Sequence, residues 1–348
     1  MRLLPALLLL SLPSAAQEPT PAPVPEESLP SPRFADRIAV ERVVMDLRIV
    51  DSKGRPIQGL TPADLRVRVD GQDAAIDSLR WVSGTTPYAE GLAPSEAAKL
   101  GAAAAPPGRL IVFFFQKDFE SSRLRGLVRM KEEARKLLDS LEPGDRVAVA
   151  SFDTHLRLWT DFTSDMTLLR RLVETSVLRE RPPALLPQGS PSLLPAFDRD
   201  AARKAGNTEA GLVVLARALA PLQGMKSLAF FGWGLGRLSG GSVTMVPEYE
   251  PARQALKDAR VVVFSLDIAD ADYHDLELGL QQVAEDTGGF YVKTHLFPDV
   301  AMERLENALL GYYTLSFEKP LLPRGVHDVE VRLVARKGEV LMNASYVD

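Results

Sequence analysis

Polar side chains that could hold a ligand follow the most apolar segment of the chain. Residues 109–115 (RLIVFFF) form a run that is typical of a strand buried on both faces, as in the middle of a parallel sheet. The polar residues Gln116, Asp118, Glu120 and Ser121 come next, before an amphipathic helix. Ligands bind at the carboxyl ends of strands in open α/β sheets. We therefore expect a binding surface here, with oxygen atoms of the kind that Mg²⁺ prefers.

Alternating strand and helix patterns surround this segment and must position it. Strands are predicted at residues 109–115, 146–152, 227–231, 261–266 and 290–292. Helices are predicted near residues 121–141, 165–177, 208–220, 250–259, 273–287 and 299–310, with a long proline-containing loop over 178–205. This alternation favours an α/β domain over residues 109–311, with a doubly wound, mostly parallel sheet and helices on both faces.

The regions before and after this domain, residues 37–82 and 312–348, carry a different pattern. Met45, Leu47 and Ile49 alternate with polar residues, which is typical of a half-buried strand. Similar alternation follows residue 312. We expect one small β-sandwich built from both ends of the chain, with the α/β domain inserted between them. The alternative is two separate hairpins that pack on the α/β core.

The first residues of the chain predict export. Arg2 precedes an apolar run, and small residues lead to a cleavage position after Ala16. Residues 1–16 are therefore expected to form a signal peptide, too short for a membrane span, with a retained anchor as the alternative. Residues 17–36 are a proline-rich, disordered linker and residues 83–108 a second linker. We expect the mature protein to be secreted or periplasmic.

Composition limits the classes of partner and site. The chain has no cysteine, which excludes disulfides and zinc–thiolate sites. Its net charge of −5 is spread over interspersed charges of both signs, so there is no electrostatic footprint for nucleic acid or anionic lipid. No later segment is long and apolar enough to span a bilayer. We expect no nucleic-acid partner and no membrane span in the mature chain.

The order of several segments resembles a von Willebrand factor A-type (vWA) domain. These segments read RLIVFFF, EPGDRVAVASFD, GNTEAGLVVLARAL, KSLAFFGWG, VVVFSLDIAD and DTGGFY. The flanking segments LRIVDSKGRPIQGLTPADLRVRVDG and GYYTLSFEKP look like those of the secreted acidobacterial vWA-related proteins. The resemblance covers nearly all of the mature chain. It implies a Rossmann-like vWA fold over residues 109–311 that presents its loops to a protein partner.

The resemblance also implies where a metal would bind. Such domains hold a divalent ion with an Asp-x-Ser-x-Ser loop, a threonine and a later aspartate. Here Gln116, Asp118 and Glu120 stand at the loop positions, and Thr208 fits the threonine. The last position falls in residues 232–234 (GWG), which offer no side-chain oxygen.

We therefore expect a degenerate metal-ion-dependent adhesion site and no cofactor. Lys117 adds a positive charge to the same loop, which disfavours a cation there. The alternative is Mg²⁺ held by Asp118, Glu120 and Thr208, with water completing the coordination. Without a metal, the carboxylates would favour the positive end of the helix that follows.

Catalysis finds little support in the sequence. The histidines are scattered without metal-ligand spacing, at positions His155, His274, His295 and His327. Residues 267–272 (DIADAD) are expected to be an acidic loop that caps a helix. Trp233, in a glycine-rich loop, could be an exposed binding residue or part of the core.

The sequence thus favours an exported, non-catalytic protein-binding or adhesion module. Its surface is expected to include the loops at residues 116–122, 153–161, 206–208, 232–242 and 267–273. The candidate binding residues are Gln116, Asp118, Glu120, Ser121, Thr208 and Trp233. The alternative class is a divergent secreted hydrolase that uses Asp118, Glu120 or His155, which predicts a deep pocket with convergent carboxylates.

Overall fold

The computed structural model describes residues 41–83, 108–179, 181–187, 189–271, 273–334 and 336–348. The expected signal peptide (1–16), the first linker (17–36) and nearly all of the second linker (83–108) lie outside the described residues. Among the residues that are described, no helix is long and apolar enough to cross a membrane.

A six-stranded sheet forms the centre of the α/β region, in the order β12–β11–β8–β5–β6–β7. Its strands are β5 (Leu110–Gln116), β6 (Arg146–Phe152), β7 (Leu156–Thr163), β8 (Lys226–Gly232), β11 (Val261–Asp267) and β12 (Tyr291–Lys293). All neighbours pair in parallel except β7, which runs antiparallel to β6. Counted along the chain, the strands stand in the order 3-2-1-4-5-6 of a doubly wound sheet. The expected α/β architecture is confirmed, and the point where the winding reverses lies between β5 and β8.

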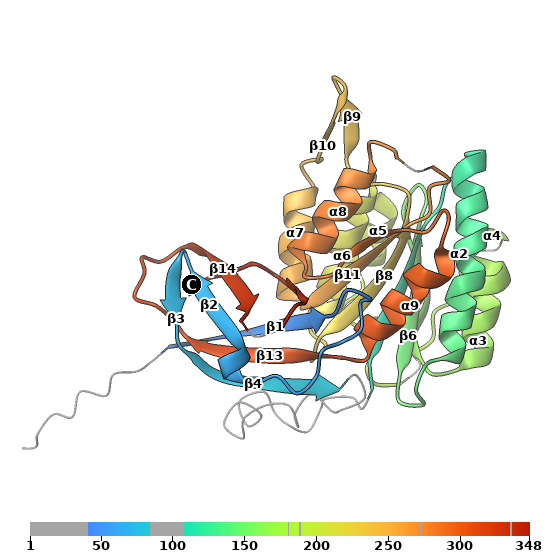
Figure 1. Ribbon diagram of the computed structural model, residues 1–348. Helices are drawn as coiled ribbons and strands as arrows, with labels where there is room; N and C mark the ends of the chain where they lie inside the picture. The colour runs from blue at the N-terminus through green and yellow to red at the C-terminus, as the bar shows by residue number, and fades with distance from the viewer. Residues whose placement is uncertain (1–40, 84–107, 180, 188, 272, 335) are drawn as a thin grey trace, which may run out of the picture. The chain divides into compact units, whose positions relative to one another are not determined.

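Helices cover both faces of this sheet (Figure 1). They are α2 (Ser121–Asp139), α3 (Met166–Arg171), α4 (Val177–Arg179), α5 (Arg199–Lys204), α6 (Thr208–Leu219), α7 (Tyr249–Asp258), α8 (Glu277–Asp286) and α9 (Pro298–Leu309). One core joins the sheet to α6, α7 and α8, and a second core joins the other face to α2, α3 and α9.

The phenylalanines of β5 show how one strand serves both cores. Phe113 and Phe115 belong to the core under α2, whereas Phe114 belongs to the core under α6. Each face pairs with β8: Phe114 meets Phe230 edge-on at 5.1 Å, and Phe115 stacks on Phe231 at 4.8 Å between ring centroids. Such pairs add to the free energy of apolar burial. They fix β5 beside β8 and so place the segment after Phe115 at the switch point.

Three loop predictions are wrong in part. Residues 153–161 were expected to be a loop, but most of them belong to strand β7, a hairpin partner of β6. Because β7 is buried almost throughout, its sequence lacks the strict alternation of a half-exposed strand. The long loop at 178–205 contains helix α5, and the loop at 232–242 contains a hairpin of β9 (Arg237–Ser239) and β10 (Ser242–Thr244), which extends beyond the sheet (Figure 1).

Strands from the two ends of the chain pair with one another in two further sheets. They are β1 (Arg42–Val50), β2 (Leu65–Val69), β3 (Gln72–Ala74), β4 (Ile76–Ser83), β13 (Gly311–Glu318), β14 (Val326–Leu333), β15 (Glu339–Met342) and β16 (Ser345–Val347). One sheet has the order β15–β1–β13–β4 and the other β16–β14–β2–β3. Leu47 and Leu315 from the first sheet share a core with Val67 and Val331 from the second.

Candidate functional site

The switch point between β5 and β8 is filled by the side chain of Gln116, the last residue of β5. Its Nε2 donates to Thr208 Oγ1 at 3.0 Å and to the carbonyl oxygen of Gly234 at 2.8 Å. Its Oε1 accepts from the backbone N–H groups of Trp233 (2.8 Å) and Gly234 (3.2 Å). A primary amide has two donor hydrogens and two acceptor lone pairs, so this side chain uses its full capacity. Gln116 and Thr208, both predicted as site residues, are thus joined by a direct hydrogen bond.

The backbone of β8 approaches Gln116 closely at Gly232. A Cβ atom there would lie 2.7 Å from the Phe230 ring and 3.0 Å from Gln116 Oε1. Contacts this short force a neighbour to move. Because Gly232 has no side chain, the amide of Gln116 can reach the backbone N–H groups of Trp233 and Gly234.

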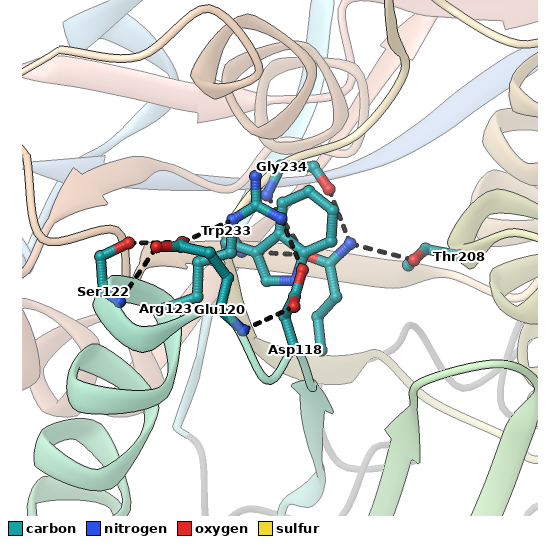
Figure 2. A network of polar contacts seen from close by, with 8 residues as sticks. Asp118, Glu120, Ser122, Arg123, Thr208, Trp233 and Gly234 are labelled. Carbon is teal, nitrogen blue, oxygen red and sulfur yellow. Dashed lines mark hydrogen bonds and ion pairs between the residues drawn. The ribbon is translucent and has the colours of Figure 1, made fainter.

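Asp118 and Glu120 are engaged by the first turn of α2. Arg123 donates to Asp118 Oδ2, and its Nε lies 3.5 Å from Glu120 Oε2. Glu120 caps the helix, since its carboxylate accepts from the N–H of Ser122 at 3.2 Å. Ser121, the remaining candidate in this loop, is the exposed first residue of α2. Figure 2 shows both carboxylates beside Arg123, with Thr208 on the other side of Trp233.

These contacts shift the pKa values of both carboxyl groups. Burial raises the pKa of Asp118, but the N–H of Glu120 and the guanidinium of Arg123 outweigh it, so that the pKa lies below its usual value. The hydroxyl and N–H of Ser122 lower the pKa of Glu120. Both groups are therefore ionised at neutral pH, and Arg123 already supplies a positive charge to them.

Lys117 does not supply that charge, contrary to the sequence interpretation. Its ammonium group points to the β6–β7 side, where it lies 3.2 Å from Asp153 Oδ2 and donates to the carbonyl oxygen of Val177 at 3.1 Å. Arg123 was not predicted as a site residue. It is the third residue of α2, and a position in a helix does not indicate that the side chain reaches back to Asp118.

Trp233 is half-buried. It is thus neither the fully exposed binding residue nor the core residue that the sequence left as alternatives. Its ring packs against the core under α2, and the guanidinium carbon of Arg123 lies 3.7 Å from the ring centroid. The indole Nε1 is buried, with no hydrogen-bond partner among the described residues. Trp233 thus supports the loop more than it presents a free aromatic surface.

Exposed apolar side chains stand instead on the loops around this crevice. Phe119, after β5, is 76% exposed, and Leu238, in the hairpin after β8, is 56% exposed. Tyr273 (64%) follows β11, and Phe297 (65%) follows β12. Phe119 is not among the predicted site residues, because that prediction rests on side chains that carry oxygen atoms. All four follow the carboxyl ends of parallel strands, which lie at one edge of the sheet.

Asp270 joins three of the elements at this edge. Its carboxylate accepts from Arg125 and Arg129 of α2 at 3.1–3.3 Å, and from His295, after β12, at 2.6 Å. The hydrogen bonds from Arg125 and His295 lower the pKa of Asp270. The expected role of residues 267–272 as a helix-capping loop is therefore wrong for Asp270, which forms ion pairs across the loops.

A second polar cluster, which is not among the predicted sites, lies at the end of β11. Asp267, His274 and Glu277 each place a ligand atom within 4.8 Å of the other two. The sequence carries part of the signal: an aspartate ends a buried strand, and a histidine stands three residues before a glutamate at the start of a helix. His274 itself lies in the loop before α8, so its spacing from Glu277 alone does not place it beside the carboxylates.

His155, the candidate of the hydrolase alternative, lies at the β6–β7 turn. Its Nδ1 is 3.1 Å from Thr154 Oγ1 and 3.9 Å from the carboxylate of Asp153, which pairs with Arg157 at 3.3 Å. The neighbouring pocket, with a volume of about 530 Å³, is lined by four arginines and by apolar side chains. Among the described residues, neither Asp118 nor Glu120 forms a hydrogen bond with His155.

Comparisons with known proteins bear on the fold alone. No family model and no curated protein sequence matches the chain. Similar solved structures include a von Willebrand factor type A protein from Catenulispora acidiphila (10% identity, TM-score 0.41, covering 69% of this chain and 65% of that chain). An aerotolerance-related membrane protein from Bacteroides fragilis gives 17% identity and a TM-score of 0.36, covering 58% of this chain and 96% of that chain.

Proximal thread matrix protein 1 from the mussel byssus gives 13% identity and a TM-score of 0.37, covering 58% of this chain and 46% of that chain. The chain thus spans less than two thirds of the byssus protein and of the Catenulispora protein. These TM-scores are all below 0.5. The doubly wound α/β fold rests on the order of the strands, and the order of the sequence segments resembles that of a vWA domain.

Proposed function

We propose that the chain is an exported, non-catalytic module that binds a protein partner through the carboxyl edge of its six-stranded sheet. Binding at the β5–β8 crevice does not use a metal ion. The two flanking sheets form a β-sandwich that carries the α/β domain, and the N-terminal segment directs export.

The hydrogen bonding of Gln116 carries this proposal. A metal at the switch point would need oxygen atoms with free lone pairs. The oxygen of Gln116 instead accepts two backbone N–H groups, and its Nε2 donates to Thr208 Oγ1. A neutral side chain with saturated hydrogen bonds stabilises the crevice as it stands. Arg123 pairs with both nearby carboxylates, which also keep contact with water. We infer a degenerate metal-ion-dependent adhesion site.

The exposed apolar side chains on the surrounding loops support protein binding. Phe119, Tyr273 and Phe297 are each more than half exposed. An aromatic ring in contact with water does not stabilise the fold, so these side chains are available to a partner. Aromatic side chains of this kind dominate the affinity of many protein interfaces. The charged residues between them would form the polar rim that such interfaces have.

The test is capture of a partner by the mature chain from the exported proteins of its source organism. Capture is measured in EDTA and in Mg²⁺, with mass spectrometry of the retained proteins. We expect one partner to be retained equally in both buffers and lost with the double substitution Phe119→Asp and Tyr273→Asp. Leu321→Asp, at a fully exposed position after β13, is the matched control and should retain the partner.

Three results would contradict the proposal. Retention that requires Mg²⁺ and disappears with Asp118→Ala would favour the metal-dependent alternative. Retention that survives the double substitution would move the binding surface elsewhere. Hydrolysis of a peptide or ester substrate that His155→Ala abolishes would favour the enzyme.

A further inference from the structure

The cluster at the end of β11 combines ligands of two chemical types. Asp267 is the last residue of β11 and almost fully buried, and Glu277 is the buried first residue of α8. His274 lies between them in the chain, in the loop before α8. The three ligand atoms, two carboxylate oxygens and one imidazole nitrogen, all lie within 4.8 Å of one another.

The contacts within the cluster converge on one oxygen atom. Asp267 Oδ2 lies 2.8 Å from His274 Nε2 and accepts from the hydroxyl of Tyr291 at 2.7 Å. The other oxygen, Oδ1, accepts from the N–H of Ala269 at 2.9 Å, which fixes the orientation of the carboxylate. Metal-binding carboxylates are held in the same way by outer hydrogen bonds.

The charges of the cluster favour a cation. Asp267 and Glu277 are both buried carboxylates, and the ammonium group of Lys293 lies 2.8 Å from Glu277 Oε2. Two carboxylate groups thus stand with one lysine and one imidazole in this cluster. A buried charge that is not compensated costs free energy, so a bound cation would stabilise this arrangement.

A separate observation points to a missing partner on the same face of β11. Ser265 stands two residues before Asp267, and alternate residues of a strand share a face. It is fully buried, and its Oγ has no hydrogen-bond partner among the described residues. Its neighbour in the sheet is Tyr291, the residue that contacts Asp267. A bound ion or water is one physical explanation for a buried hydroxyl without a partner.

We propose that Asp267, His274 and Glu277 bind a divalent transition-metal ion, with Tyr291 and Lys293 as outer partners. One imidazole and two carboxylates make a donor set suited to Zn²⁺ and Mn²⁺, and three protein ligands leave a position for water. An ion that prefers oxygen alone, such as Ca²⁺, would gain less from the imidazole. The inference is independent of the proposed function, because it uses none of the residues of the β5–β8 crevice.

Calorimetric titration of Zn²⁺ into the mature chain, freed of any polyhistidine tag, tests this site. Co²⁺ provides a second readout, since its visible absorption reports the ligand set. We expect one bound ion per chain. His274→Ala should weaken binding by about 100-fold or more, and Tyr291→Phe by about 10-fold, in line with the loss of an outer partner.

The matched control is His295→Ala, which removes the other histidine–aspartate pair at this edge, formed with Asp270. Zn²⁺ affinity and the Co²⁺ spectrum should not change in this variant. Circular dichroism establishes that each variant is folded. The site is refuted if the folded wild-type chain takes up no Zn²⁺, or if His274→Ala and Glu277→Gln bind it as the wild type does. It is equally refuted if His295→Ala lowers the affinity as much as His274→Ala.

Discussion

Two polar sites stand at the same edge of one sheet, and they differ in the groups that they bury. At the β5–β8 crevice, the neutral amide of Gln116 uses its four hydrogen bonds on Thr208 and on the backbone of Trp233 and Gly234. At the end of β11, two carboxylates are buried, those of Asp267 and Glu277, and Lys293 pairs with Glu277. The fold brings polar residues to both places, because parallel strands end at a common edge. The residue types then decide whether a site is closed by its own side chains or open to a cation.

The largest effect on stability is expected from Gln116→Leu. This substitution leaves two N–H groups, a carbonyl oxygen and the hydroxyl of Thr208 without their partner in a buried crevice. Since each buried unsatisfied group costs roughly 1–3 kcal/mol and some will find water, we expect a loss of about 3 kcal/mol in the free energy of unfolding. Urea denaturation measures it.

Gln282→Leu serves as the control for that experiment. Gln282 is an exposed glutamine of α8 that donates to Asp286, and its loss should change the free energy by less than about 0.5 kcal/mol. If Gln116→Leu costs no more than this control, Gln116 does not hold the crevice closed.

A somewhat smaller effect of opposite sign, a gain in the free energy of unfolding, is expected from Lys226→Met. Lys226 is buried at the amino edge of the sheet and has no ion pair among the described residues. Burial, followed by the charge of Arg260, lowers the pKa of Lys226 from 10.5 to about 7. Above pH 7 the unfolded chain binds more protons than the folded one, so stability should rise with pH between 7 and 10.5. Lys226→Met removes this slope. At pH 7 it should stabilise the fold by about 2 kcal/mol, because the hydrogen bond lost at the carbonyl oxygen of Leu222 offsets part of the gain.

Thermal unfolding of both proteins across this pH range measures the slope. A wild-type stability that is flat from pH 7 to 10, or a variant that is less stable at pH 7, would show that Lys226 is well accommodated as a cation. Buried charge would then not be costly in this fold, and the buried carboxylates of Asp267 and Glu277 would give no reason to expect a bound cation.

A loss of about 1 kcal/mol is expected for Asp270→Ala. The carboxylate links Arg125 and Arg129 of α2 to His295, but its side chain keeps partial contact with water, which limits the value of each ion pair. Differential scanning calorimetry at low and high salt measures the change. A loss that persists undiminished in high salt would show that the pairs do not act through exposed charges.

Phe119→Ser should have the smallest effect on stability, below about 0.5 kcal/mol, because the ring is 76% exposed. Partner retention should nevertheless fall in this variant. A large drop in stability, measured by urea denaturation, would mean that the ring packs against the fold, and its assignment to the binding surface would be wrong.

The sequence predicted the fold where burial is uniform or strictly alternating. The three phenylalanines 113–115 identified a central strand, and Met45, Leu47 and Ile49 a half-buried one. Strand β7 was missed because its residues are buried without a period of two. The prediction of a loop there followed from polar residues at the β6–β7 turn.

The candidate sites were less predictable because they depend on side-chain direction. No sequence pattern indicates that Lys117 points towards Asp153 or that Arg123 pairs with Asp118. It placed Gln116 and Thr208 in separate loops, and only the closed sheet brings them to 3.0 Å. The cluster of Asp267, His274 and Glu277 likewise needs β11 and α8 in their final positions.

Titration with Mn²⁺, followed by electron paramagnetic resonance of the free ion, tests the contrast between the two sites most directly. Mn²⁺ accepts both oxygen and imidazole ligands, so it would report either site. We predict one bound ion in the mature chain, retained in Asp118→Ala and lost in His274→Ala. Binding that is lost in Asp118→Ala and retained in His274→Ala would contradict the account, because the metal would then lie at the crevice that Gln116 is inferred to close.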